Sequence, residues 1–189
     1  AQQRADAFAA ASQERAAKAY ANDLIQPDLV PIATRSAEQG WGYASTDEPM
    51  RPGTTVEDLA GLKTPFRPHG RVTAGNSAGI NDGATACVLA SAEAAAELGL
   101  TPKMKLVSYG FAGVEPEVMG VGPVPATEKA LKLAGLTIEA IGPVGVNEAF
   151  AVVTMAAMRG HGIPHERMNV HGGACALGHP IGASGARIL

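Results

Sequence analysis

Aromatic side chains are scarce in this sequence and make up 4% of its 189 residues. Alanine and glycine are abundant instead, and such small side chains let helices pack closely on a sheet. The composition therefore favours an α/β protein over a β-sandwich. Long apolar runs are lacking too, since none approaches the roughly 18 residues that a bilayer-spanning helix needs, and no membrane partner is predicted.

Basic charge and cysteine are also in short supply. The chain has 15 Lys and Arg against 18 Asp and Glu, and its net charge of -3 leaves no polybasic patch for nucleic acid or anionic lipid. Cys87 and Cys175 are the only cysteines, and their spacing shows no disulfide framework. A reducing compartment is favoured, so we predict a cytoplasmic protein, with an organelle matrix as the alternative. Residues 1–10 show no signal-peptide pattern.

Small and apolar side chains at helical spacing, together with capping residues, predict a series of helices. Ser91 is placed to N-cap one of them and Gly99 to end it. The predicted helices cover residues 2–20, 92–98, 125–135 and 149–159, and a further helix begins at Ser184, where we expect the sequence to be cut within a helix.

Near-continuous runs of small and apolar residues predict buried strands between these helices. Residues 35–53 are punctuated by glycine and proline, which indicates an irregular flap. The predicted strands lie within residues 71–91 and at residues 104–111, 143–146 and 168–171.

The densest chemical signal lies in residues 172–185, where five glycines surround one histidine, His179. Glycine allows backbone conformations and close approaches that other residues forbid. A tight packing turn with a solvated histidine is the simplest interpretation of an isolated Gly-His-Pro sequence.

The wider context favours an active site instead. The segment "GGACALGHPIGASG" at residues 172–185 resembles the C-terminal signature of the thiolase family, which surrounds an active-site histidine. Three further segments resemble thiolase motifs and occur in the family's order: "VTAGNSAGINDGA" at residues 72–84, "VMGVGPVPA" at 118–126 and "VNEAF" at 146–150. The resemblance covers essentially the whole chain and is weakest between residues 35 and 53.

This resemblance implies the thiolase fold, a layered α/β/α/β/α arrangement that this chain would form only in part. Residues 1–70 would be the end of an inserted loop domain, residues 71–102 the close of the N-terminal half, and residues 103–189 a truncated C-terminal half. Thiolases are usually dimers or tetramers, so a homodimer or homotetramer is expected.

The activity that the resemblance implies is an acyl transfer, the reversible Claisen condensation and thiolysis between acetyl-CoA and an acyl-CoA through an S-acyl-cysteine. Acyl-CoA and CoA are the expected substrates, with no metal and no other cofactor. The family's nucleophilic cysteine and its second catalytic cysteine fall in motifs that match neither Cys87 nor Cys175. We therefore expect the chain to be inactive alone.

Carried over by position, His179 and Asn147 are the expected catalytic residues. His179 would activate the nucleophilic thiol and then donate toward a thioester oxygen, because imidazole can both accept and donate a proton. Asn147 would hold an ordered water that completes an oxyanion hole with a histidine. Otherwise it is a buried asparagine that satisfies backbone groups. Glu148 is expected to be structural rather than the base.

Ser77, Ala78, Met119 and Phe150 are the residues expected to bind the CoA substrate. The sequence has Gly75-Asn76-Ser77-Ala78-Gly79 where the family often has "GNASG", so either the Ser77 hydroxyl or the Ala78 backbone would make the contact. Met119 and Phe150 would wall the acyl and pantetheine pocket, although either could be ordinary core.

Several alternatives stay open at this point. Histidines at 161, 165, 171 and 179, with Cys175, could hold zinc, but no metal-binding spacing frames them. Cys175 could be a stray nucleophile, whereas Cys87 is expected to be a buried free thiol. The glycine-rich segments match no nucleotide-binding motif. The alternative from another class is a thiolase-like protein that binds acyl-CoA or lipid without condensing it.

Overall fold

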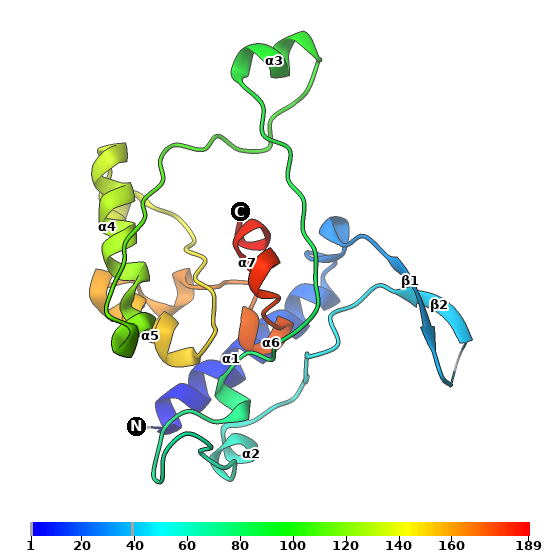
Figure 1. The fold of residues 1–189 in the computed structure, drawn as a ribbon, viewed down its shortest axis with the longest axis vertical. Helices are drawn as coiled ribbons and strands as arrows, with labels where there is room; N and C mark the ends of the chain where they lie inside the picture. The colour runs from blue at the N-terminus through cyan, green and yellow to red at the C-terminus, as the bar shows by residue number, and fades with distance from the viewer. Residues whose placement is uncertain (1, 39) are drawn as a thin grey trace.

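The computed structural model of the chain describes residues 2–38 and 40–189. Helices gather around a long first helix, while a hairpin and a short helix project away from them (Figure 1). The helices are α1 (Gln2–Ala21), α2 (Val56–Ala60), α3 (Ala92–Glu97), α4 (Pro123–Ala134), α5 (Ala151–His161), α6 (Ala174–Leu177) and α7 (Ile181–Ile188). The 3-10 turns are η1 (Gln26–Asp28), η2 (Ala74–Asn76), η3 (Pro116–Val121), η4 (Ile138–Ala140) and η5 (His165–Arg167).

Helix α1 forms the centre of the core. Its buried face carries Phe8, the polar side chains of Asp6, Ser12 and Gln13, and four small alanines. Because the alanines are small, α2, α5 and α6 all pack against α1. Met168 and Ile163 complete the same apolar cluster. No helix in the described part of the chain is long and apolar enough to cross a membrane.

An antiparallel hairpin of β1 (Ile32–Ser36) and β2 (Gly40–Ala44) begins three residues before the predicted flap and extends into it. Trp41 lies opposite Arg35 in its register, and Tyr43 opposite Ala33, so one face carries both aromatic side chains. All residues of both strands that the structure describes are exposed. The glycines and prolines of this region led to the prediction of an irregular flap. The aromatic and β-branched residues between them favour strands and form the hairpin.

Two predicted strand regions are not strands in this chain. Residues 81–90 and 101–111 run in extended loops without regular structure, rising to α3 and returning to α4 (Figure 1). Their side chains are exposed rather than buried: Val88 is 89% accessible and Phe111 is 82% accessible. A strand needs a neighbour for its backbone hydrogen bonds, and none lies beside these segments within the described residues.

The two remaining predicted strands are reduced to isolated bridges. Val144 pairs in parallel with Met168, and the Val144 amide donates to the Arg167 carbonyl at 2.8 Å. This bridge brings the segment before Asn147 beside the segment that leads toward His179. The bridge therefore matters for the site although no strand extends from it.

The helix predictions are largely confirmed. Ser91 caps α3 as expected, since its hydroxyl accepts from the Ala94 amide at 3.1 Å. Helices α1 and α4 match their predicted ranges to within a few residues, and α5 starts two residues later than predicted. Helix α7 begins at Ile181, before Ser184, and the short α6 lies inside what was expected to be loop. Pro180 is the N-cap of α7, and the amides of Ala183 and Ser184 both donate to its carbonyl at 2.8 Å, so the first turn is already closed at Ser184.

Candidate active site

The segment at residues 77–79 joins the motif that carries Asn147. Ser77 and Phe150 form an antiparallel bridge. The amide of Ala78 donates to the Ala149 carbonyl at 3.1 Å. The predicted CoA-binding segment therefore lies directly against the "VNEAF" motif, and Phe150, half-buried, is the residue from which α5 begins.

The same segment also joins the loop that carries His179. The His179 amide donates to the Gly79 carbonyl at 3.1 Å and to Asn81 Oδ1 at 3.2 Å. Gly178 adopts φ +85, and a Cβ there would overlap the Asn81 side chain. Glycine before His179 is thus required both by the left-handed backbone and by the close approach of Asn81.

These contacts place Asn147 and His179 side by side. Asn147 Nδ2 lies 3.2 Å from His179 Nε2. On the other side of the ring, Nδ1 lies 2.7 Å from Ser184 Oγ, and that hydroxyl donates to the Pro180 carbonyl at 3.0 Å. Since the Ser184 proton is engaged, Ser184 accepts from Nδ1–H. The hydrogen-bond network thus assigns the neutral tautomer, with the Nε2 lone pair facing the Asn147 amide.

One polar atom at this junction has no hydrogen-bond partner among the described residues. Asn147 Oδ1 is inaccessible, and no donor among the described residues reaches it. A buried amide oxygen normally has a hydrogen-bond partner, so Asn147 Oδ1 is an unsatisfied acceptor at this junction. Together the amide and the half-buried imidazole can hold a thioester oxygen and exchange a proton with a thiol.

The predicted substrate-binding residues are not all brought to this junction. Ser77 Oγ donates to the Thr73 carbonyl at 2.7 Å, and the Ala78 amide is used by Ala149, so both of the expected contacts are engaged within the protein. Met119 lies on η3 with 56% of its surface accessible. Since η3 packs on α5, Met119 lies against the helix that begins after Phe150.

Ser184 and Asn81 are site residues that were not predicted, although both lie inside segments that resemble thiolase motifs. Ser184 is buried, at 3% accessibility, and it follows His179 by five residues. Its placement on the first turn of a helix that begins beside the histidine was the available signal. Asn81 contacts a residue 98 positions away, and no local pattern predicts such a contact.

The cysteines differ from each other in surroundings. Cys87 is exposed, so the expectation of a buried thiol there was wrong, because its segment lacks a neighbouring strand. Cys175 is buried, and this burial raises the pKa of its thiol, with the negative charge of Glu148 acting in the same direction. A thiol held protonated is a poor nucleophile. Within the described residues, no three His, Cys, Asp or Glu side chains are grouped to hold a metal ion.

Comparison with known proteins decides the family. Residues 1–93 match the family described as "Thiolase, N-terminal domain", and residues 100–189 match "Thiolase, C-terminal domain". The chain belongs to the thiolase family. Its fold is accordingly part of the α/β thiolase fold, as predicted. The proposed division at residues 70 and 102 stays a prediction.

Individual thiolases resemble this chain along its length. It is 49% identical to an acetyl-CoA acetyltransferase of Pseudomonas aeruginosa over 185 residues. The aligned region covers 97% of this chain and 47% of that protein. It is 46% identical to the 3-oxoadipyl-CoA/3-oxo-5,6-dehydrosuberyl-CoA thiolase of Escherichia coli, with 97% of this chain and 46% of that protein covered. The chain thus spans about half the length of these relatives.

Solved structures give the same picture. The Bacillus anthracis acetyl-CoA acetyltransferase superimposes with a TM-score of 0.95 at 40% identity, covering 100% of this chain and 48% of that one. Human mitochondrial 3-ketoacyl-CoA thiolase superimposes with a TM-score of 0.91 at 37% identity. The superposition covers 100% of this chain and 47% of that one. The exposed segments of this chain therefore follow the course of the backbone in thiolases.

Proposed function

We propose that this chain supplies the His179 and Asn147 part of an acyltransferase that condenses and cleaves CoA thioesters. The observation that carries the proposal is the pairing of Asn147 Nδ2 with His179 Nε2 at 3.2 Å, with Ser184 fixing the opposite ring nitrogen. The pair offers a proton acceptor and an amide on one face of a half-buried junction. Acyl transfer from a thioester needs both.

In the proposed reaction, the Nε2 lone pair of His179 takes the proton of an attacking thiol. The resulting Nε2–H then donates to the thioester oxygen as negative charge develops there. Asn147 Oδ1, which lacks a protein donor among the described residues, would hold the water that shares this oxygen. The acylated cysteine would belong to the part of the thiolase fold that this chain does not match.

Acetyl-CoA and CoA are proposed as substrates, because relatives of similar identity are named acetyl-CoA acetyltransferase and β-ketoadipyl-CoA thiolase. We propose no particular length for the acyl chain of the second CoA thioester. A binding pocket distinguishes acyl chains that differ by one methylene group by only about 1–3 kcal/mol. We further propose a cytoplasmic homodimer or homotetramer that works without a metal or other cofactor.

The test is cleavage of acetoacetyl-CoA by CoA, measured on the complete gene product. His179→Ala should lower kcat by about 10² to 10⁴-fold, because it removes the proton carrier. His171→Gln is the matched control, since His171 is exposed and lies in the same loop region. Binding of acyl-CoA without cleavage in the unmodified protein would instead support an acyl-CoA or lipid carrier.

A further inference from the structure

Glu148, beside Asn147, is a charged side chain that is fully buried, at 0% accessibility. Removing a carboxylate from water is costly unless hydrogen bonds replace its hydration. All of its observed partners are protein groups. Both carboxylate oxygens accept hydrogen bonds from the protein.

The partners of Glu148 come from three other segments. Oε2 accepts from Ser12 Oγ of α1 at 2.6 Å and from the Cys175 amide of α6 at 3.0 Å. Oε1 accepts from Asn169 Nδ2 at 2.7 Å. Gly173 lies so close that a Cβ there would overlap the Glu148 carboxyl group. One carboxylate thus joins the Asn147 motif to α1 and to the loop that leads to His179.

Ser12 and Asn169 extend these links. The Ser12 hydroxyl donates to Glu148 and accepts from the Gly173 amide at 3.0 Å. Asn169 donates to the Val146 carbonyl at 2.8 Å, and its Oδ1 accepts from the Val146 amide at 2.8 Å. The backbone on the N-terminal side of Asn147 is therefore held by Asn169, and the backbone before His179 is held by Ser12 and Glu148.

We propose that Glu148 is a positioning residue, which sets the Asn147 amide against the His179 ring through Ser12, Asn169 and the Cys175 amide. This inference rests on the proposed function. Cys175 lies in the first turn of α6, and α6 ends at Leu177, directly before Gly178 and His179. A shift of α6 relative to Glu148 would change the distance between Asn147 and His179. Catalysis is sensitive to displacements of about 1 Å, which can cost 10²-fold.

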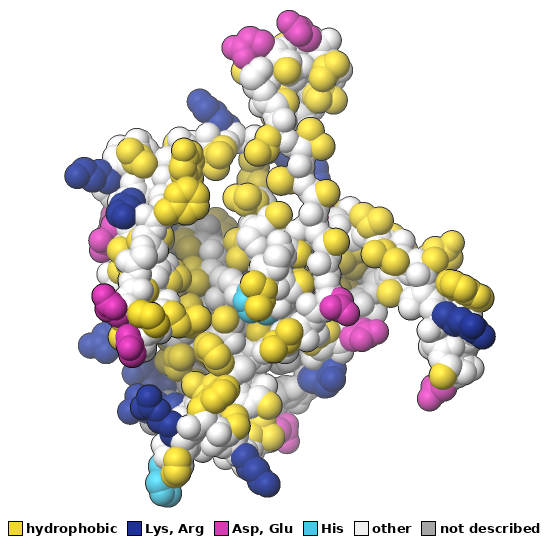
Figure 2. Space-filling view, in the orientation of Figure 1, with side chains coloured by type: hydrophobic (Ala, Val, Ile, Leu, Met, Phe, Trp, Pro, Cys, Tyr) yellow, Lys and Arg dark blue, Asp and Glu magenta, His cyan; other side chains and the backbone are white. Residues whose placement is uncertain are grey.

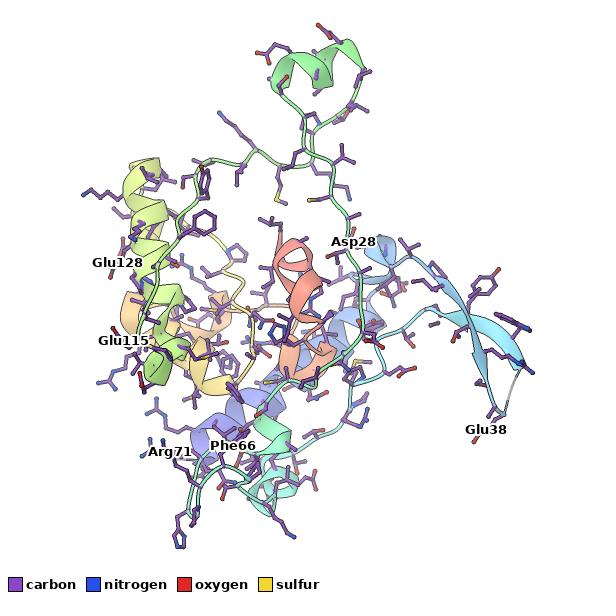
Figure 3. All side chains as sticks on the ribbon, viewed as in Figure 1. Asp28, Glu38, Phe66, Arg71, Glu115 and Glu128 are labelled. Carbon is purple, nitrogen blue, oxygen red and sulfur yellow. The ribbon has the colours of Figure 1, made fainter. Side chains whose placement is uncertain are left out.

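Glu148→Gln is the informative variant because it keeps the shape of the side chain. A glutamine oxygen can still accept from Ser12 and Cys175, but its NH₂ then faces the NH₂ of Asn169, and two donors cannot bond. Glu128→Gln is the matched control, since Glu128 is exposed on α4 (Figure 3). Ser12→Ala tests the same link from the other side, and Ser12→Cys, a weak donor of similar size, should recover part of the loss.

The experiment measures acetoacetyl-CoA thiolysis and unfolding temperature for these variants of the complete gene product. Glu148→Gln and Ser12→Ala should lower kcat by about 10²-fold while KM changes by less than about threefold, because alignment rather than binding is lost. Equal kcat in Glu148→Gln and Glu128→Gln would overturn the proposal. A rise in KM as large as the fall in kcat would also overturn it, because substrate binding would then be lost as well. A fall in kcat that disappears when the assay is run well below the unfolding temperature would overturn it too, because the loss would then come from unfolding.

A second readout separates this inference from the proposed function. The ¹⁵N resonances of the His179 ring report its tautomer without any turnover. In Glu148→Gln they should shift toward a mixture of tautomers, and in Glu128→Gln they should not. An inactive unmodified protein whose His179 signals respond in this way would refute the thiolase activity and keep the positioning role. Unchanged His179 signals in Glu148→Gln would refute the positioning role.

Discussion

His179 is defined by what each of its ring nitrogens contacts. Ser184 accepts from Nδ1, Asn147 donates toward Nε2, and Asn81 accepts from the His179 backbone amide. Ser184 and Asn147 therefore hold the two ring nitrogens, while the distant Asn81 holds the backbone of the same residue. A histidine held in a single tautomer can act at Nε2 without first reorienting, which is how positioning lowers an activation barrier.

Ser184→Ala should test this arrangement at the residue scale. The variant leaves Nδ1–H without its acceptor, so the ring can rotate and exchange tautomers. We expect kcat/KM for thiolysis to fall by about 10 to 100-fold, with about 1 kcal/mol lost from the free energy of unfolding. Ser91→Ala, which removes only the N-cap of α3, is the control for stability. Wild-type kcat/KM in Ser184→Ala would show that the contact with Nδ1 is dispensable.

At the scale of elements, the contact of α1 with the loop before α6 depends on glycine. A Cβ at Gly172 would lie 2.7 Å from the Ser12 carbonyl oxygen, and a Cβ at Gly173 would overlap the Glu148 carboxyl group. Such overlaps force the loop away from α1. The loop then carries His179 with it.

Gly173→Ala should therefore destabilise the protein by about 1–3 kcal/mol, the usual cost of overpacking. Gly185→Ala is the matched control, because a Cβ at Gly185 in α7 meets nothing within 4 Å. Alanine favours a helix over glycine, so this control should hold or raise stability. Chemical denaturation of both variants checks the prediction, and equal midpoints would contradict the tight packing described at Gly173.

The turn η5 carries a histidine, His165, whose pKa is lowered in the folded protein. His165 stacks on Phe8 of α1 with ring centroids 4.9 Å apart. Burial lowers the pKa of His165 below its ordinary value of 6.5, and the nearby charge of Arg15 lowers it further. A depressed pKa means that the folded state favours the neutral ring. This contribution to stability is present above pH 6.5 and is lost as the pH falls through the lower folded-state pKa.

His165→Phe should keep the stacking and remove the titration. We expect the urea midpoint of the unmodified protein to fall more steeply than that of the variant as the pH decreases below 6.5. The two midpoints are compared at each pH. Parallel curves would show that His165 titrates alike in the folded and unfolded states.

Helices were more predictable than strands because their signals are local. Ser91 and Gly135 mark the ends of helices, and Gly135 adopts φ +67 as a helix-terminating glycine does. A strand depends instead on a distant partner, so the apolar run at residues 104–111 could not reveal that its neighbour is missing here. The motifs placed Asn147 and His179, but contacts such as Asn81 with His179 cross 98 positions and leave no local trace.

At the scale of the whole molecule, apolar side chains lie open along the extended segments. Figure 2 shows hydrophobic side chains over the course that rises to α3 and descends to α4. Leu106, Val107 and Tyr109 are each at least 60% accessible. Exposed apolar patches of this extent mark surfaces that another chain segment covers. The chain spans about half the length of its thiolase relatives, so the remaining portion of that fold can provide the cover.

Amide hydrogen exchange should show whether another part of the protein packs on these extended segments. In the 189-residue chain, amides of residues 81–90 and 101–111 should exchange almost freely, because they lack strand partners within the described residues. In the complete gene product, the same amides should be protected by strand pairing. Mass spectrometry of peptides from both regions gives the comparison, with α1 peptides as the protected reference. Free exchange in both proteins would mean that these segments are ordinary loops.

The most direct measurement is a double-mutant cycle on Asn147 and His179, assayed by acetoacetyl-CoA thiolysis in the complete gene product. If the two residues act as one unit, the Asn147→Ala and His179→Ala double variant loses no more than about threefold beyond the worse single variant. If their losses multiply, the residues act independently and the 3.2 Å pairing has no catalytic meaning. Full activity in either single variant would contradict the proposed site altogether.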